Sequence, residues 1–188
     1  MRLLVTIILL ICNSAFILAQ PTDDGYISIK GAEHSLGVNM RFIPPQGWKE
    51  IAPIRPHVVK NYINPIDGSG MNILISELPT FVSRNEFKES MNDFYLELYK
   101  ELKNDSYFSS FIELSHQFIT LDKYPFVEIN AMVESQNNNH RYIFTTLITV
   151  YEDKRIHINF YIMSSQTDYT IPKKVINSVV FPDQYLNY

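Results

Sequence analysis

The segment from Arg141 to Met163 constrains the fold more than any other part of the chain. It reads RYIFTTLITVYEDKRIHINFYIM, two runs rich in Tyr, Ile, Phe, Thr and Val with a charged turn at 152–154 between them. These residue types favour a strand over a helix, because branched and aromatic side chains pack well on a pleated surface. Both faces of the first run are largely apolar. We therefore expect a β-hairpin at the centre of a sheet, covered on each face.

Alternating apolar residues and turn signals predict the remaining strands. A short edge strand is expected near Tyr26–Ile29, and longer strands at 38–43, 58–63, 71–77, 113–121 and 124–134. Pro44-Pro45 ends one of these strands, because proline cannot donate to a ladder. Trp48 follows that break in the chain, and we interpret it as a packing anchor.

Two helices are expected. Ser83 and Glu86 form a capping box, in which each side chain satisfies a free backbone amide of the first helical turn. The apolar stripe of this long helix consists of Phe87, Met91, Phe94, Tyr95, Leu98 and Leu102. A second, short helix has Pro172 in its first turn.

The order of these elements predicts the fold class. Runs of strands with few helices are typical of an α+β fold, here with a mainly antiparallel sheet of six to seven strands. We expect one long and one short helix to sandwich it. The expected divisions are a signal peptide at 1–19, a leader at 20–37, a single domain at 38–182 and a tail at 183–188.

The N-terminus predicts export. Arg2 is followed by an apolar run and then by a mixed region ending at Ala19, the pattern of a secretory signal peptide cleaved after that residue. An uncleaved membrane anchor and lipid attachment at Cys12 are the alternatives. Cys12 is the only cysteine, so the cleaved domain would have none and would depend on its core alone.

The charge argues against a nucleic-acid partner. The formal net charge is −4, and removal of the signal peptide with Arg2 makes it −5. Removing 19 of the 188 residues leaves 169, enough for one domain with a sizeable core. No extended basic segment remains to neutralise phosphates.

Three stretches give the chain a resemblance to the PsbP-like superfamily. They are Met40-Arg41-Phe42-Ile43-Pro44 with Gly47-Trp48, then Met71-Asn72-Ile73-Leu74-Ile75 before the capped helix, and Val175-Ile176-Asn177-Ser178-Val179-Val180-Phe181 after the last strands. That group includes the extrinsic photosystem II subunit, a Ran-binding nuclear-import factor and exported bacterial proteins of the DcrB type. The resemblance covers about 38–182 and implies a non-enzymatic binding or assembly factor, with no binding residue carried across.

No residue set in the sequence has the pattern of a catalytic centre or a cofactor site. There is no Gly-x-Ser-x-Gly elbow and no phosphate-binding glycine loop. Glu33-His34-Ser35 places an acid, a base and a hydroxyl side by side, but triads are assembled from distant parts of a chain. We assign no catalytic, cofactor-binding or metal-binding residue.

Two further groups of residues were weighed as ion sites. His116 and His157 lie on predicted strands and would bind a metal if they met across the sheet, although two separate half-exposed histidines are the favoured interpretation. Asn64, Asp67 and Ser69 offer oxygens for calcium. Their loop has too few carboxylates for a good site, so turn capping by Asp67 is favoured.

The tyrosines supply the functional hint. Part of a set of seven is expected at the surface, where tyrosine favours contacts with partners; the set is Tyr26, Tyr62, Tyr142, Tyr151, Tyr161, Tyr185 and Tyr188. We expect an exported, non-catalytic binding or assembly module of the bacterial envelope that acts through a protein partner and needs no cofactor. The alternative is a small hydrolase or ligand carrier with a site built from dispersed residues. The partner, its binding residues and the oligomeric state stay open.

Overall fold

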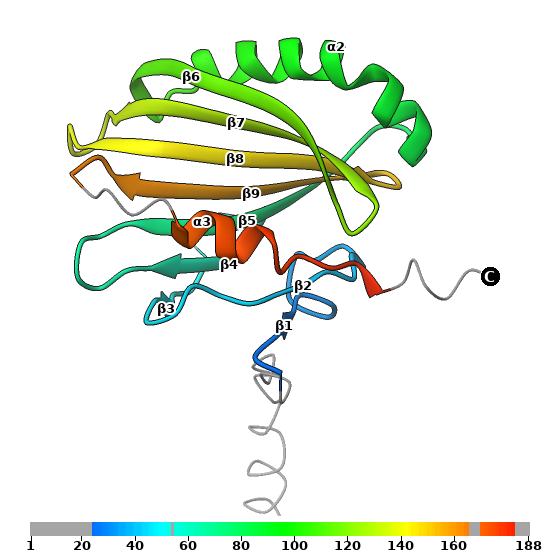
Figure 1. The fold of residues 1–188 in the computed structure, drawn as a ribbon, viewed down its shortest axis with the longest axis horizontal. Coiled ribbons are helices and arrows are strands. Elements are labelled where there is room, and N and C mark those ends of the chain that lie inside the picture. The colour runs from blue at the N-terminus through cyan, green and yellow to red at the C-terminus, as the bar shows by residue number, and fades with distance from the viewer. Residues whose placement is uncertain (1–23, 54, 166–169, 183–188) are drawn as a thin grey trace, which may run out of the picture.

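Seven antiparallel strands form the main sheet in the computed structural model, which describes residues 24–53, 55–165 and 170–182 (Figure 1). Their order across the sheet is β3 (Lys49–Glu50), β4 (Val58–Ile63), β5 (Gly70–Glu77), β9 (Lys154–Met163), β8 (Arg141–Tyr151), β7 (Tyr124–Ser135) and β6 (Phe108–Leu121). A separate two-stranded sheet pairs β1 (Ile27–Ser28) with β2 (Arg41–Phe42). The α+β fold class and the antiparallel sheet are confirmed. The predicted signal peptide, Cys12 and the tail at 183–188 lie outside the described residues.

The predicted hairpin is present near the middle of the sheet. β8 and β9 pair from Tyr142 opposite Met163 to Tyr151 opposite Lys154. Glu152 takes a positive φ of 58° in the turn, which lets two residues reverse the chain. Strand β9 then pairs on its other side with β5, so the hairpin connects the N-terminal and C-terminal strands of the sheet.

The long helix α2 (Arg84–Lys103) begins as predicted. Ser83 Oγ accepts a hydrogen bond from the Glu86 amide at 3.2 Å, and Glu86 Oε2 accepts one from the Ser83 amide at 2.8 Å. Phe87, Met91 and Leu98 are its buried residues. They pack on a group from β7 and β8, which consists of Val127, Ile129, Ile148 and Val150. In the described part of the chain, no helix combines the length and apolar character that a membrane crossing requires.

The other face of the sheet carries the largest group of buried side chains. The short helix α3 (Thr170–Ile176) contributes Val175 and Ile176 to it. The segment before β2 contributes Ile29 and Met40, and both side chains are fully buried against the sheet. Trp48 packs against this group, which agrees with its predicted role as an anchor.

The structure differs from the predicted elements at three strands. The expected strand at 38–43 is reduced to Arg41–Phe42. The residues before it make single backbone hydrogen bonds to the turn that follows Ile29, and these do not form a continuous ladder with a neighbouring strand. The strand expected to begin at residue 113 begins at Phe108, where serines hide the alternating pattern. The two residues of β3 had no signal in the sequence.

Candidate binding site

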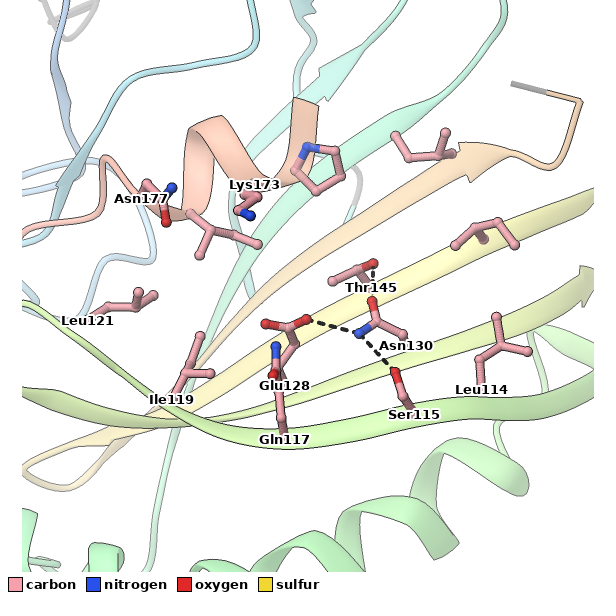
Figure 2. Close-up of a pocket in the computed structure, with 14 residues that line it drawn as sticks. Leu114, Ser115, Gln117, Ile119, Leu121, Glu128, Asn130, Thr145, Lys173 and Asn177 are labelled. Atoms are coloured by element: carbon pink, nitrogen blue, oxygen red, sulfur yellow. Dashed lines mark hydrogen bonds between the residues drawn. The ribbon is translucent and has the colours of Figure 1, made fainter. Parts of the chain in front are cut away.

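A hollow of about 590 Å³ lies between the sheet and α3 (Figure 2). Strands β6, β7, β8 and β9 form its floor, and α3 with the residue that follows it forms one wall. Half of its lining side chains are apolar and half are polar. They are Leu114, Ser115, Gln117, Ile119, Leu121, Glu128, Asn130, Ile143, Thr145, Ile162, Pro172, Lys173, Ile176 and Asn177.

A hydrogen-bonded network crosses the floor of this first hollow, with Asn130 at its centre (Figure 2). Asn130 Nδ2 donates to Glu128 Oε1 at 2.9 Å, and Thr145 Oγ1 donates to Asn130 Oδ1 at 2.7 Å. A longer contact of 3.4 Å joins Asn130 Nδ2 to Ser115 Oγ. The register explains this network, because Asn130 lies opposite Ser115 on β6 and opposite Thr145 on β8. The amide and the Glu128 carboxylate are therefore held in fixed orientations.

The opposite wall supplies a cation. Lys173 and Asn177 extend from the α3 region, across the hollow from Glu128 and Asn130 in Figure 2. Both side chains are exposed, whereas Pro172 and Ile176 beside them are buried. A ligand would thus meet a carboxylate and an amide on one side, an ammonium on the other and apolar side chains between them.

The lining of this hollow contains few ionisable side chains. Among the described residues that line the hollow, Glu128 is the only carboxylate, and no histidine or cysteine accompanies it. The hydroxyls of Ser115 and Thr145 both contact Asn130, and the hydrogen bond of the Glu128 carboxylate also goes to Asn130. Within the described ranges, no three His, Cys, Asp or Glu residues come together as a metal site would require.

The hollow opens toward the edge strand β6. Ile112 and Leu114 on this strand are each 53% exposed, and Phe118 is 46% exposed. The strand pairs with β7 on one side only, and its register shifts between Phe108 and Ser110 and again between Glu113 and Ser115. The edge strand of 14 residues, half of them apolar, thus borders the half-apolar hollow, with Leu114 in the lining and Phe118 on the α2 face beside His116.

The two strand histidines do not meet. His116 lies on β6 and His157 on β9, with two strands between them, so they are separated by about 14 Å at the usual strand spacing. His116 Nδ1 lies 2.7 Å from Glu113 Oε1 instead, and its ring stacks on Tyr95 at 3.9 Å. The register shift after Glu113 explains this pair, because residues three apart on a regular strand would point to opposite faces.

The two groups of loop residues, at 33–35 and 64–69, make only local contacts. His34 Nε2 lies 3.6 Å from Glu33 Oε1, while Ser35 is buried and makes no hydrogen bond to His34. In the other loop, Asp67 Oδ1 accepts a hydrogen bond from the Ser69 amide at 2.7 Å. Asp67 therefore caps the turn between β4 and β5, as the favoured interpretation holds.

Two members of the tyrosine set belong to the core. Tyr62 and Tyr151 are buried, at 3% and 9% exposure, because each packs within the large apolar group beneath α3. Tyr26, Tyr142 and Tyr161 are half-buried, while Tyr185 and Tyr188 fall beyond the described residues. Among the described residues, the exposed tyrosine is Tyr107, which is not a member of that set.

The residues of the first hollow were not found from the sequence. Glu128, Asn130 and Thr145 occupy alternate positions on two predicted strands, where a polar face usually indicates solvent. One sequence feature could have indicated the site: Thr145 is a polar residue in a strand whose two faces are otherwise largely apolar. Whether this threonine joins a polar network depends on which strand pairs beside it, and the sequence does not reveal that pairing.

The seven-stranded antiparallel sheet with its long helix is a PsbP-like fold. The chain is similar to the solution structure of cyanobacterial PsbP (CyanoP) from Synechocystis sp. PCC 6803, with a TM-score of 0.56 and 13% identity over 90% of this chain and 98% of that one. It is also similar to a crystal structure from Bacteroides thetaiotaomicron VPI-5482, with a TM-score of 0.49 and 11% identity over 74% of this chain. The chain spans 44% of that second protein. No family model matches the sequence, and no curated protein matches it.

Proposed function

We propose that this chain is an exported, non-catalytic binding module of the bacterial envelope, similar to the DcrB type, which acts through a protein partner. The observation that carries the proposal is the open edge of β6 beside the first hollow. In this proposal an extended segment of the partner adds to the sheet along β6 and places a side chain in the hollow. The apolar run before Ala19 supports export, and the engagement of Glu128, Ser115 and Thr145 with Asn130 supports a non-catalytic role.

The composition of β6 supports a partner strand. Natural proteins protect a long edge strand with lysine, proline, a bulge or an inward-pointing charge. Strand β6 has two register shifts, at Phe108–Ser110 and Glu113–Ser115. The sequence of β6, FSSFIELSHQFITL, has no lysine, arginine, aspartate or proline. Its one charged residue, Glu113, accepts hydrogen bonds from the Tyr95 hydroxyl at 2.9 and 3.0 Å and so turns toward α2. An edge of this kind fits strand addition, in which the partner's backbone supplies affinity and its alternate side chains supply specificity.

The chemistry expected of the partner segment follows from the hollow. Leu114 and Ile119 beside the edge favour an apolar side chain, and Glu128 on the floor favours a donor or a cation. We therefore expect an extended segment with alternate apolar residues and at least one basic or amide residue. The alternative of a small hydrolase draws no support from a specific contact. The alternative of a ligand carrier is taken up in the next subsection, because it concerns a second hollow.

The test uses two leucines of nearly equal exposure. A photo-crosslinking amino acid replaces Leu114 on β6, at 53% exposure, or Leu96 on α2, at 47% exposure. We expect irradiation of cells that produce the full-length protein to give a defined adduct with another protein from position 114 and not from position 96. Leu114→Lys should then reduce recovery of that partner at least tenfold at an unchanged melting temperature. Leu96→Lys should leave recovery unchanged. Adducts from both positions alike, or from neither, would contradict the proposal.

A further inference from the structure

A second hollow, of about 450 Å³, lies on the opposite face of the sheet. Neighbouring residues of one strand point to opposite faces, so on β8 Thr145 lines the first hollow and Phe144 lines the second. Helix α2 packs on β6, β7 and β8, and its last turns form one wall through Leu98 and Leu102. Strands β4, β5 and β9 supply much of the floor.

Three asparagines cross this floor in a single row. Asn61 on β4 lies opposite Asn72 on β5, and Asn72 lies opposite Asn159 on β9. All three line the hollow, and we call them the asparagine row. Asn159 Nδ2 donates to Asn72 Oδ1 at 3.0 Å. A row of amides on three neighbouring strands offers donors and acceptors at the regular spacing of the sheet.

Asn159 has an unmet requirement for a hydrogen bond. The residue is only 6% exposed, and its Oδ1 has no partner among the described residues. The hydroxyl of Thr146, opposite Asn159 on β8, likewise has no partner among the described residues. A buried polar atom without a partner costs free energy. A hydroxyl or amide group that reached this end of the hollow would remove that cost after a small movement of the overlying side chains.

The ionisable groups beside the row are held neutral. Burial, with a smaller effect of Arg155, lowers the pKa of His157 to about 3. Burial likewise raises the pKa of Tyr161 to about 12. Both residues line the hollow, two positions before and after Asn159 on β9. At neutral pH the floor therefore presents uncharged donors and acceptors.

The rim combines the Tyr107 ring with charged side chains of both signs, namely Arg55, Glu101 and Asp105. Tyr107 is 44% exposed, and the guanidinium of Arg55 lies 3.7 Å from the centre of its ring. Glu101 at the end of α2 forms an ion pair with Arg155 at 3.3 Å. An aromatic ring beside a neutral polar floor suits a ligand that has both an apolar face and several hydroxyl groups.

We propose that the second hollow binds a neutral saccharide, whose hydroxyl and acetamido groups bond to Asn72 and Asn159 while one sugar face packs on Tyr107. This site is on the other face of the sheet from β6 and the first hollow, so it stands independently of the proposed function. The neutral floor disfavours a ligand with a net charge, and the rim residues Arg55 and Asp105 carry charges of opposite sign. An uronic acid or a phosphorylated sugar should therefore bind more weakly than its neutral counterpart.

The test begins with the full-length protein on a glycan array that contains neutral, acidic and phosphorylated saccharides. Isothermal titration calorimetry then measures N,N′-diacetylchitobiose, cellobiose and maltose, together with the best neutral glycan from the array. We expect at least one neutral saccharide to bind with a dissociation constant below about 1 mM, which we take as the weakest binding that counts as specific. We expect Asn72→Ala and Tyr107→Ala each to weaken that binding at least tenfold.

Matched controls keep the test decisive. Asn130→Ala removes an asparagine from the polar network of the first hollow and should leave saccharide affinity unchanged. Tyr107 is exposed, so Tyr107→Ala remains informative even if Asn72→Ala lowers the melting temperature. Three results would overturn the proposal. They are no binding by any neutral saccharide, stronger binding of the acidic glycans, and an equal loss of affinity in Asn130→Ala. A water molecule as the sole partner of Asn159 in crystals soaked with the best saccharide would also overturn it.

Discussion

The Ser178 hydroxyl joins two parts of the chain that are 135 residues apart. Its Oγ accepts a hydrogen bond from the Ile43 amide at 2.9 Å and donates one to the Val175 carbonyl at 2.6 Å. The neighbouring residues Arg41 and Val180 exchange two backbone hydrogen bonds of 2.9 Å. The segment after α3 is therefore tied to β2 by one side chain and one short bridge.

Ser178→Ala should lower the free energy of unfolding by about 1–3 kcal/mol, because the partly buried Ile43 amide loses its hydrogen-bond partner, while the Val175 carbonyl keeps the Ser178 amide at 3.0 Å. Urea titration followed by circular dichroism measures the change. Ser109→Ala is the control, since Ser109 is exposed and its hydroxyl makes one bond of 3.3 Å. It should change stability by less than about 0.5 kcal/mol. Similar losses of unfolding free energy in the two variants would mean that the hydrogen bonds of the Ser178 hydroxyl do not stabilise the fold.

Phe87→Ala should cost about 3–5 kcal/mol, the usual range for a buried aromatic side chain. Phe87 is 1% exposed and meets Phe94 edge to face, with ring centres 5.0 Å apart. Phe94 lies on the inner stripe as predicted but is only half-buried, so Phe94→Ala should cost less. Asp93→Ala on the exposed side should cost less than about 0.5 kcal/mol. A larger loss in Asp93→Ala than in Phe94→Ala would contradict the assignment of the helix faces.

Ser83→Ala should destabilise the protein by about 0.5–2 kcal/mol, because it removes the N-cap that accepts from the Glu86 amide. Ser90 in the same helix is also exposed, and its hydroxyl bonds back to the Glu86 carbonyl at 2.9 Å. Alanine is the better helix former at such an interior position, so Ser90→Ala should be neutral or slightly stabilising. Thermal unfolding of the two variants separates capping from the mere loss of a hydroxyl.

His157 should make the folded protein less stable in acid. Burial, assisted by Arg155, lowers its pKa to about 3, while the unfolded chain has the ordinary histidine value of about 6.5. Between these two values the unfolded state binds the additional proton, so stability is complete above the unfolded pKa and falls as the pH drops toward 3. The slope is at most about 1.4 kcal/mol for each pH unit. Urea titrations from pH 7 to pH 4 measure this slope.

His157→Gln removes this titrating group, so the slope of the unfolding free energy against pH should fall by up to about 1.4 kcal/mol for each pH unit. This change is expected whatever the substitution does to stability at pH 7. His140→Gln is the control, since His140 is exposed in the turn between β7 and β8. That variant should keep the slope of the parent protein. An unchanged slope in His157→Gln would show that the ring is protonated as easily in the folded state as in the unfolded one.

Removal of metal ions should leave the melting temperature unchanged. The large apolar group beneath α3 and the group beneath α2 supply the packing, at roughly 25 cal/mol for each Å² of apolar surface removed from water. Differential scanning calorimetry with and without EDTA makes the comparison. A decrease of more than a few degrees in EDTA would make the loop around Asp67 a calcium site after all.

The parts of the fold that could be predicted depend on local patterns. The β8–β9 hairpin follows from alternation around a short turn, and the start of α2 follows from Ser83 and Glu86, three residues apart. The asparagine row could not be predicted in this way. Asn72 and Asn159 are 87 residues apart, and only the pairing of β5 with β9 brings them together. Likewise, the contact between Glu113 and His116 needs a register shift that no residue in the strand announces.

The pairing of β5 with β9 also bears on how the chain is made. The other pairs of the main sheet join strands that follow one another in sequence, so each can close soon after synthesis. Strand β5 must wait for a partner 87 residues further along, a delay of roughly 4–17 s at ordinary rates of translation. Throughout that interval Met71, Ile73 and Ile75 lie on a strand without one neighbour. A chaperone bound to β5 during that interval would keep this edge from pairing with another chain.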